Sequence, residues 1–89
     1  MKYNYLVELN KIFATYFNDK KLKLNENTSS KNIKTWDSLA QVSLIILIEK
    51  KFKIKFSVKE VNNLKNIGEM IKLLKKKKKW KIINFVKLK

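Results

Sequence analysis

The sequence has no cysteine and no histidine. Without cysteine the chain can form no disulfide, no zinc-finger ligand set and no cysteine nucleophile. Without histidine it lacks the commonest general base and a common metal ligand. These absences argue against a hydrolase with a cysteine nucleophile or a Ser-His pair, and we expect no enzyme activity and no metal site.

Proline is also absent, and the only glycine is Gly68. Folds with many strands need tight turns, which are rich in these two residues, so a sheet-rich fold is not expected. The 89 residues fit one small domain, which buries only about 60–65% of the surface that its unfolded chain exposes. The core must therefore be small and regularly patterned.

Acidic residues are few and arginine is missing, which leaves a net charge of +15. Residues 1–49 hold 7 lysines and 5 acids, whereas residues 50–89 hold 15 lysines and 2 acids. A strongly basic chain is typical of proteins that bind nucleic acid or anionic membranes. Arginine, however, is the usual side chain for reading guanine and for clamping phosphate, so its absence weakens that interpretation.

Long apolar runs are missing as well. No stretch approaches the roughly 20 apolar residues of a membrane span. Residues 1–8 carry one lysine and no apolar run of signal-peptide length. We expect a cytoplasmic, monomeric protein.

The first predicted helix runs from about Tyr3 to Phe17. Its apolar residues recur at the spacing of one helix face, which we expect to be buried: Leu6, Leu9, Phe13, Tyr16 and Phe17. A long polar loop follows over residues 18–35, a length that is usually functional or mobile in so small a domain. Its apolar residues should anchor it to the body: Leu22, Leu24 and Ile33.

The second predicted helix opens around residues 35–38, with Thr35, Asp37 and Ser38 as candidate caps, and ends near Lys51. At about 100° per residue its apolar side chains form two groups. One should face the core: Leu44, Ile45, Ile48 and Phe52. The other begins beside Ser38 and is adjoined by Lys50: Leu39, Val42 and Ile46. A second apolar stripe is either buried or used by partners, and in so small a bundle we favour a partner surface.

Two shorter helices follow. Ser57 and Glu60 have the spacing of a capping box, which predicts a third helix through about Asn63. Asn66 and Glu69 repeat that spacing and predict a fourth, with an apolar face of Ile67, Met70, Ile71, Leu73 and Leu74. The prediction is an all-α protein, a small four-helix bundle with a long loop between helices one and two.

Three segments carry a more specific signal. Residues 36–39 read Trp-Asp-Ser-Leu at the start of the second helix, and residues 49–60 follow the pattern E-x-x-F-x-I-x-[IF]-[ST]-x-x-E. Residues 66–70 read Asn-Ile-Gly-Glu-Met at the start of the fourth helix. In this order and spacing, from about Ile33 to Leu74, they resemble the attachment region and the following helix junctions of the acyl carrier protein family.

The resemblance implies a carrier function. Ser38 would bear a 4'-phosphopantetheine group, installed from coenzyme A by a phosphopantetheinyl transferase, with Asp37 and Leu39 as flanking recognition residues. A phosphodiester there would lie at the positive end of a helix dipole. The chain would hold acyl or aminoacyl intermediates as thioesters and deliver them to loading and transferring enzymes. Those enzymes would dock on Leu39, Val42, Ile46 and Lys50.

The chain departs from the family in its charge, because family members are usually acidic. Gln41 and Ser43 stand where carboxylates are common, and two lysines, Lys50 and Lys51, follow Glu49. We therefore expect poor binding by general fatty acid synthesis enzymes. Dedicated partners in a specialised lipid, polyketide, peptide or glycan-modifying pathway are expected instead.

The resemblance ends near Leu74, so we expect a carrier domain at residues 1–74 and a basic, aromatic tail or helix extension at residues 75–89. No helical or strand period fits the tail cleanly. Lysines among aromatic residues suit an anionic membrane surface or single-stranded nucleic acid; alternatively, the tail packs back on the body. The alternative function is a small basic helical module that binds nucleic acid or anionic membrane.

Overall fold

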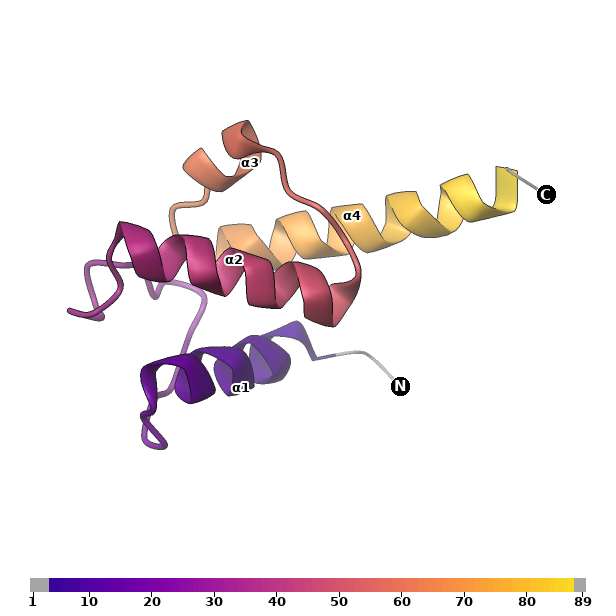
Figure 1. Ribbon diagram of the computed structural model, residues 1–89. Helices are drawn as coiled ribbons and strands as arrows, with labels where there is room; N and C mark the ends of the chain where they lie inside the picture. The colour runs from indigo at the N-terminus through magenta and orange to yellow at the C-terminus, as the bar shows by residue number, and fades with distance from the viewer. Residues whose placement is uncertain (1–3, 88–89) are drawn as a thin grey trace.

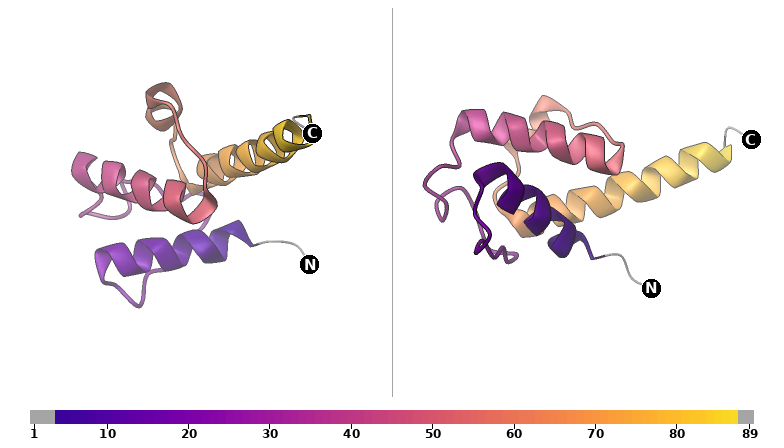
Figure 2. Two further views of the ribbon diagram at one scale, coloured as in Figure 1. Left: turned by 45° about the vertical axis from the view of Figure 1, so that its right-hand side comes forward. Right: turned by 60° about the horizontal axis from the view of Figure 1, so that its bottom comes forward.

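The computed structural model describes the backbone of residues 4–87 and the side chains of residues 4–78. Within that range it has no strand and four helices (Figure 1): α1 (Tyr5–Phe17), α2 (Ser38–Phe52), α3 (Val58–Asn62) and α4 (Ile67–Lys87). α1 runs opposite to α2 and α4 and packs against both (Figure 2). The predicted all-α bundle, with its long loop between α1 and α2, is confirmed.

Side-chain caps fix where the first two helices begin. The side chain of Asn4 accepts a hydrogen bond from the Val7 amide at 3.1 Å, so α1 starts at Tyr5. We had placed this start near Tyr3, which lies outside the described residues. Of the three candidate caps of α2, Asp37 is the one that caps the helix, because its carboxylate accepts a hydrogen bond from the Ala40 amide at 2.8 Å.

The caps predicted for α3 and α4 are both present. Ser57 and Glu60 form a reciprocal capping box, with the two hydrogen bonds at 3.1 and 2.8 Å. The side chain of Asn66 accepts from the Glu69 amide at 2.9 Å and opens α4. These contacts satisfy amides that have no partner inside the helix.

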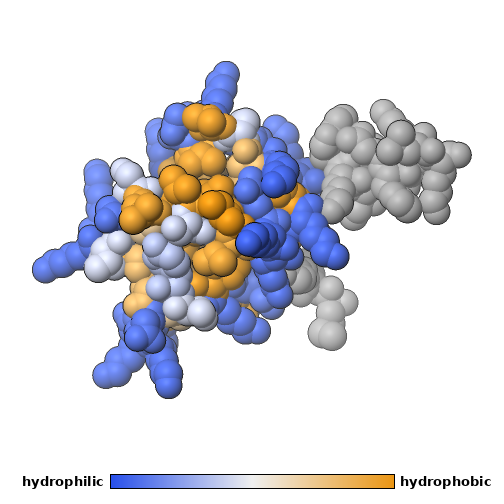
Figure 3. Space-filling model, viewed as in Figure 1, coloured by the Kyte–Doolittle hydropathy of each residue, from blue (hydrophilic) through white to orange (hydrophobic). Residues whose placement is uncertain are grey.

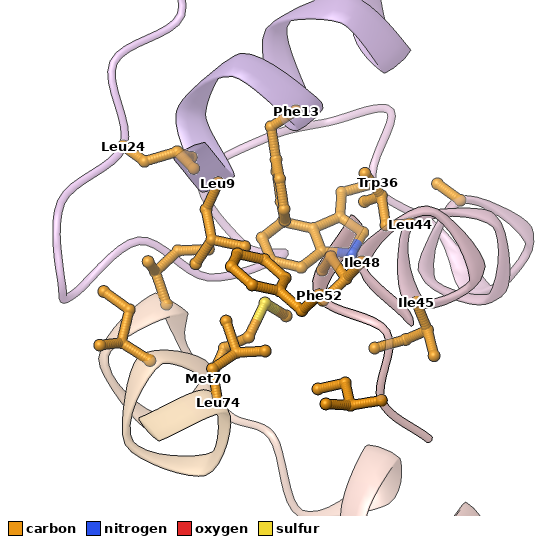
Figure 4. Close-up of a cluster of buried hydrophobic side chains, with 14 residues drawn as sticks. Leu9, Phe13, Leu24, Trp36, Leu44, Ile45, Ile48, Phe52, Met70 and Leu74 are labelled. Carbon is orange, nitrogen blue, oxygen red and sulfur yellow. The ribbon is translucent and has the colours of Figure 1, made fainter. Parts of the chain in front are cut away.

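The core lies between α1, α2 and α4 (Figure 4). Phe13 and Trp36 meet edge to face in it, with ring centroids 5.0 Å apart. The group predicted to face the core from α2 is buried throughout: Leu44, Ile45, Ile48 and Phe52. The fourth helix contributes Ile67, Met70, Ile71 and Leu74 as expected, whereas Leu73 is only partly buried and lies outside this core.

The face predicted for the first helix is right except at its edge. Leu9 and Phe13 are fully buried, and Leu6 and Phe17 are partly buried against the core. Tyr16 is exposed, and its ring lies edge-on to Phe17 with centroids 5.0 Å apart. A tyrosine at the rim of a face keeps its hydroxyl in water while its ring packs on a neighbour. The expectation that Tyr16 belongs to the core is wrong.

The loop between α1 and α2 is held to α1 by one side chain. Asn10 donates to the Leu22 carbonyl at 3.0 Å and accepts from the Leu24 amide at 2.6 Å. Leu24 is buried, and Leu22 and Ile33 are partly buried against the core. The three predicted loop anchors are therefore confirmed.

The same loop also meets the start of α4. The Ile67 amide donates to the Thr28 carbonyl at 2.9 Å, and the Gly68 amide donates to the Glu26 carbonyl at 2.8 Å. A Cβ at Gly68 would lie 3.1 Å from that Glu26 oxygen. Glycine is used here because the loop backbone approaches the helix closely.

α4 continues without a break past Leu74 to Lys87, and it projects beyond the end of α2 (Figure 1). Lysine is a good helix former, and two lysines of the run contact the body. Lys77 lies 2.7 Å from the Glu60 carboxylate, and Lys78 donates to the Phe52 carbonyl at 3.4 Å. The division between residues 1–74 and 75–89 stays a prediction. No helix in the described part of the chain is long and apolar enough to span a membrane.

Candidate functional site

Ser38 is the first residue of α2 and its side chain is exposed. Because Asp37 caps the helix, the Ser38 hydroxyl is not needed for capping, and it has no hydrogen-bond partner among the described residues. It stands where the first-turn amides of the helix point outward and the dipole is positive. The geometry leaves an accessible hydroxyl in a setting that favours an attached anion.

Trp36 fixes the chain just before this turn. Its indole is buried against Phe13, and its Nε1 donates to the Gln41 Oε1 at 2.7 Å. The indole therefore bridges the core and the first turn of α2, as expected of a packing anchor. Sequence reasoning missed Gln41 in this role, because the contact depends on how the chain turns before Ser38.

A hollow of about 510 Å³ opens beside Ser38 between α2, α3 and the start of α4. Its apolar lining comes from Val42, Val61, Leu64 and Met70. Its polar lining comes from Ser30, Asp37, Gln41, Asn62, Lys65 and Asn66. The mixed lining suits a ligand with both polar and apolar parts. Most of these residues were not predicted, because they are far apart in the sequence.

α3, which forms one wall of the hollow, is fixed by contacts at its first turn. Glu49 of α2 accepts from the Phe56 amide at 2.8 Å and so positions the connection into α3. The Lys77 ammonium, together with the Ser57 amide, holds the pKa of Glu60 below its usual range. The Lys77 ammonium also lies 5.8 Å from the Phe56 ring centroid. α3 is therefore tied to both α2 and α4.

The residues predicted to dock partners all face solvent. Leu39 is 74% exposed, Val42 56% and Ile46 45%, and Lys50 is exposed beside them. Figure 3 shows apolar side chains gathered over α2 and reaching α3, with polar side chains at the border. The predicted split of α2 into a buried group and an exposed stripe is confirmed, whereas docking itself stays a prediction.

A comparison with solved structures finds the solution NMR structure of a holo acyl carrier protein from Geobacter metallireducens. The two chains are 39% identical and superpose with a TM-score of 0.81, over 86% of this chain and 88% of that one. The chain belongs to the acyl carrier protein family. No family model matches the sequence, and a search of curated proteins finds no match either.

Membership of the acyl carrier protein family makes the chain a carrier and not a catalyst. This agrees with the expectation that the chain is not an enzyme. No cluster of metal-ligating side chains occurs in the part of the chain that the structure describes.

Proposed function

We propose that Ser38 carries a 4'-phosphopantetheine group, and that the chain delivers acyl or aminoacyl groups bound to it to partner enzymes. One observation carries this proposal: Ser38 presents an exposed hydroxyl, relieved of capping by Asp37, at the edge of a hollow with mixed lining. The similar structure from Geobacter metallireducens is described as a holo acyl carrier protein, which supports the same cofactor here.

The residues around Ser38 fit such a group. The outward-pointing amides of the first turn suit a phosphodiester on the serine oxygen. Gln41, Asn62 and Lys65 offer polar contacts for the amides of an arm, and Val42 and Leu64 offer apolar ones. When bound, the group supplies the thiol that a cysteine-free chain lacks, and acyl groups attach to that thiol as thioesters.

Asp37 and Leu39 have separate parts in this proposal. The Asp37 carboxylate is fixed by its bond to the Ala40 amide, so it presents a negative charge of defined position beside the hydroxyl. Leu39, the most exposed residue of the apolar stripe on α2, offers a contact next to the site. A phosphopantetheinyl transferase that modifies Ser38 would recognise both side chains.

Intact-mass measurement after incubation with a broad-specificity transferase and coenzyme A tests the proposal. The full chain should gain the mass of one phosphopantetheine, and Ser38→Ala should gain none. Ser30→Ala is the matched control, because Ser30 is also exposed and lines the same hollow. It should be modified like the natural chain. Equal modification of Ser38→Ala would overturn the assignment.

Partner enzymes remain defined only by class. We infer loading and transferring enzymes matched to this carrier, in a specialised lipid, polyketide, peptide or glycan-modifying pathway. The exposed Lys50 beside the stripe, in place of a row of carboxylates, supports dedicated partners.

Contact of residues 75–89 with an anionic membrane or nucleic acid is a separate proposal. Lys75 and Lys76 are exposed, which supports it. Lys77 and Lys78 are engaged with Glu60 and the Phe52 carbonyl, so less of the lysine run is available than the sequence suggests.

A further inference from the structure

Most of the exposed large apolar side chains in the described part of the chain lie on α2 and at the start of α3. Seven large apolar side chains are exposed among the described residues, and two of them, Val7 and Tyr16, belong to α1. The other five lie on α2 and at the first residue of α3: Leu39, Val42, Ile46, Leu47 and Val58. A contiguous apolar patch on a small folded protein marks an interaction surface. This patch begins at Ser38.

A second hollow lies at the far end of the stripe from Ser38. Its volume is about 400 Å³, and Ile46 and Ile54 line it together with Lys50, Lys53 and Lys55. Glu49 supplies the carboxylate of this lining, and one oxygen of that carboxylate accepts from the Phe56 amide. The space is therefore lined by two apolar side chains and by more lysines than carboxylates.

Two lysines of this lining form no ion pair within the described part of the chain. Lys50 and Lys55 are exposed, and none of the ion pairs among the described residues uses them. Lys51, by contrast, lies 3.7 Å from the Glu8 carboxylate. Lysines that make no internal contact next to an apolar hollow can pair with carboxylates of a partner at little cost to the fold.

We propose that this face docks a partner protein whose contact surface is an apolar side chain flanked by carboxylates. The apolar side chain would enter the hollow beside Ile46, and the carboxylates would pair with Lys50 and Lys55. The exposed apolar residues here are aliphatic, so the face lacks the aromatic platforms on which single-stranded nucleic acid stacks. The inference rests on the proposed function, since a partner docked along α2 reaches whatever Ser38 carries.

A titration with two designed peptides tests this inference. Both are amphipathic helices with a leucine face, one flanked by glutamates and the other by lysines at the same positions. The acidic peptide should bind the full-length isotope-labelled chain and shift the backbone NMR signals of Ile46, Lys50 and Lys55. The basic peptide should not shift these signals, because its lysines would lie against Lys50 and Lys55.

Charge reversal locates the contact on this face. Lys50→Glu with Lys55→Glu should weaken binding of the acidic peptide by about tenfold, which corresponds to about 1.4 kcal/mol. Lys20→Glu with Lys31→Glu is the matched control. It changes the net charge equally, at exposed positions of the loop between α1 and α2, and should weaken binding no more than about twofold.

Three outcomes, besides failure of the acidic peptide to bind, would overturn the inference. Equal weakening by both double variants would mean that net charge alone attracts the peptide, and equal binding of both peptides would mean that the rim does not select by charge. If vesicles with anionic lipid shift the same NMR signals and the acidic peptide does not, the face is a membrane surface. Modification at Ser38 is measured separately by mass. A chain that accepts the arm but ignores the acidic peptide overturns this inference alone, whereas the reverse result overturns the proposed function alone.

Discussion

Two isoleucines on α2 should respond very differently to truncation. Ile48 is completely buried in the core, whereas Ile46 is 45% exposed on the apolar stripe. Ile48→Ala should lower the free energy of unfolding by about 2–5 kcal/mol, because a buried side chain is lost and a cavity remains. In a domain of this size each kcal/mol lowers the melting temperature by about 4–8 °C, so a drop of about 8–40 °C is expected.

Ile46→Ala should change the free energy of unfolding by no more than about 0.5 kcal/mol, as exposed substitutions usually do. The better helix propensity of alanine offsets part of the lost contact. Thermal melts followed by circular dichroism, with both variants and the natural chain side by side, measure the difference. If Ile46→Ala melts as early as Ile48→Ala, the stripe of Leu39, Val42 and Ile46 belongs to the core and the docking surface lies elsewhere.

Three further predictions concern α3 and α4. Gly68→Ala should destabilise the fold by about 1 kcal/mol in urea denaturation, since crowding against the Glu26 carbonyl outweighs the helix propensity of alanine; a more stable variant would mean that the loop yields freely. The lowered pKa of Glu60 stabilises the folded chain. This stabilisation is fully present above the ordinary pKa of glutamate, and it is lost as pH falls through the lowered pKa of the folded state. Glu60→Gln should therefore flatten the acid side of the stability profile, and an unchanged profile would contradict the role of Lys77. A chain ending at Leu74 should remain helical and accept the arm; loss of helicity on circular dichroism would place the residues beyond it in the core.

The helices were predictable because their signals are local. A capping side chain and the amide that it accepts from are three residues apart, as at Asp37 and Ala40, so spacing alone reveals them. Core faces follow the helical period, which is why Ile48 and Ile46 could be assigned to opposite environments. Tyr16 shows the limit of this method, because period does not tell how far a neighbouring element covers the edge of a face.

Contacts between distant segments were not predictable in the same way. Asn10 meets the loop at Leu24, and Gln41 meets Trp36, only after the chain has folded back on itself. An asparagine inside a helix was the one available signal, because asparagine is a poor helix former. The sequence left open whether residues 75–89 form a tail or an extension of α4, for a different reason. Lys77 and Lys78 contact Glu60 and the Phe52 carbonyl through their ammonium groups, and such polar contacts leave no apolar period in the sequence.

The hydrogen bonds of the long loop divide it into two parts of unequal local stability. Leu22 to Thr28 is bonded to α1 and to the first turn of α4. Residues 29–32 bond only among themselves, between Ser29, Lys31 and Asn32, among the described residues. Amide hydrogens in this polar turn should therefore exchange with solvent through small local openings. Amide hydrogens at the start of α4 should exchange only when the whole bundle unfolds. Because Ser30 lines the hollow beside Ser38, opening of this turn would widen that side of the hollow while the hydrogen bonds of Leu22 to Thr28 stay in place.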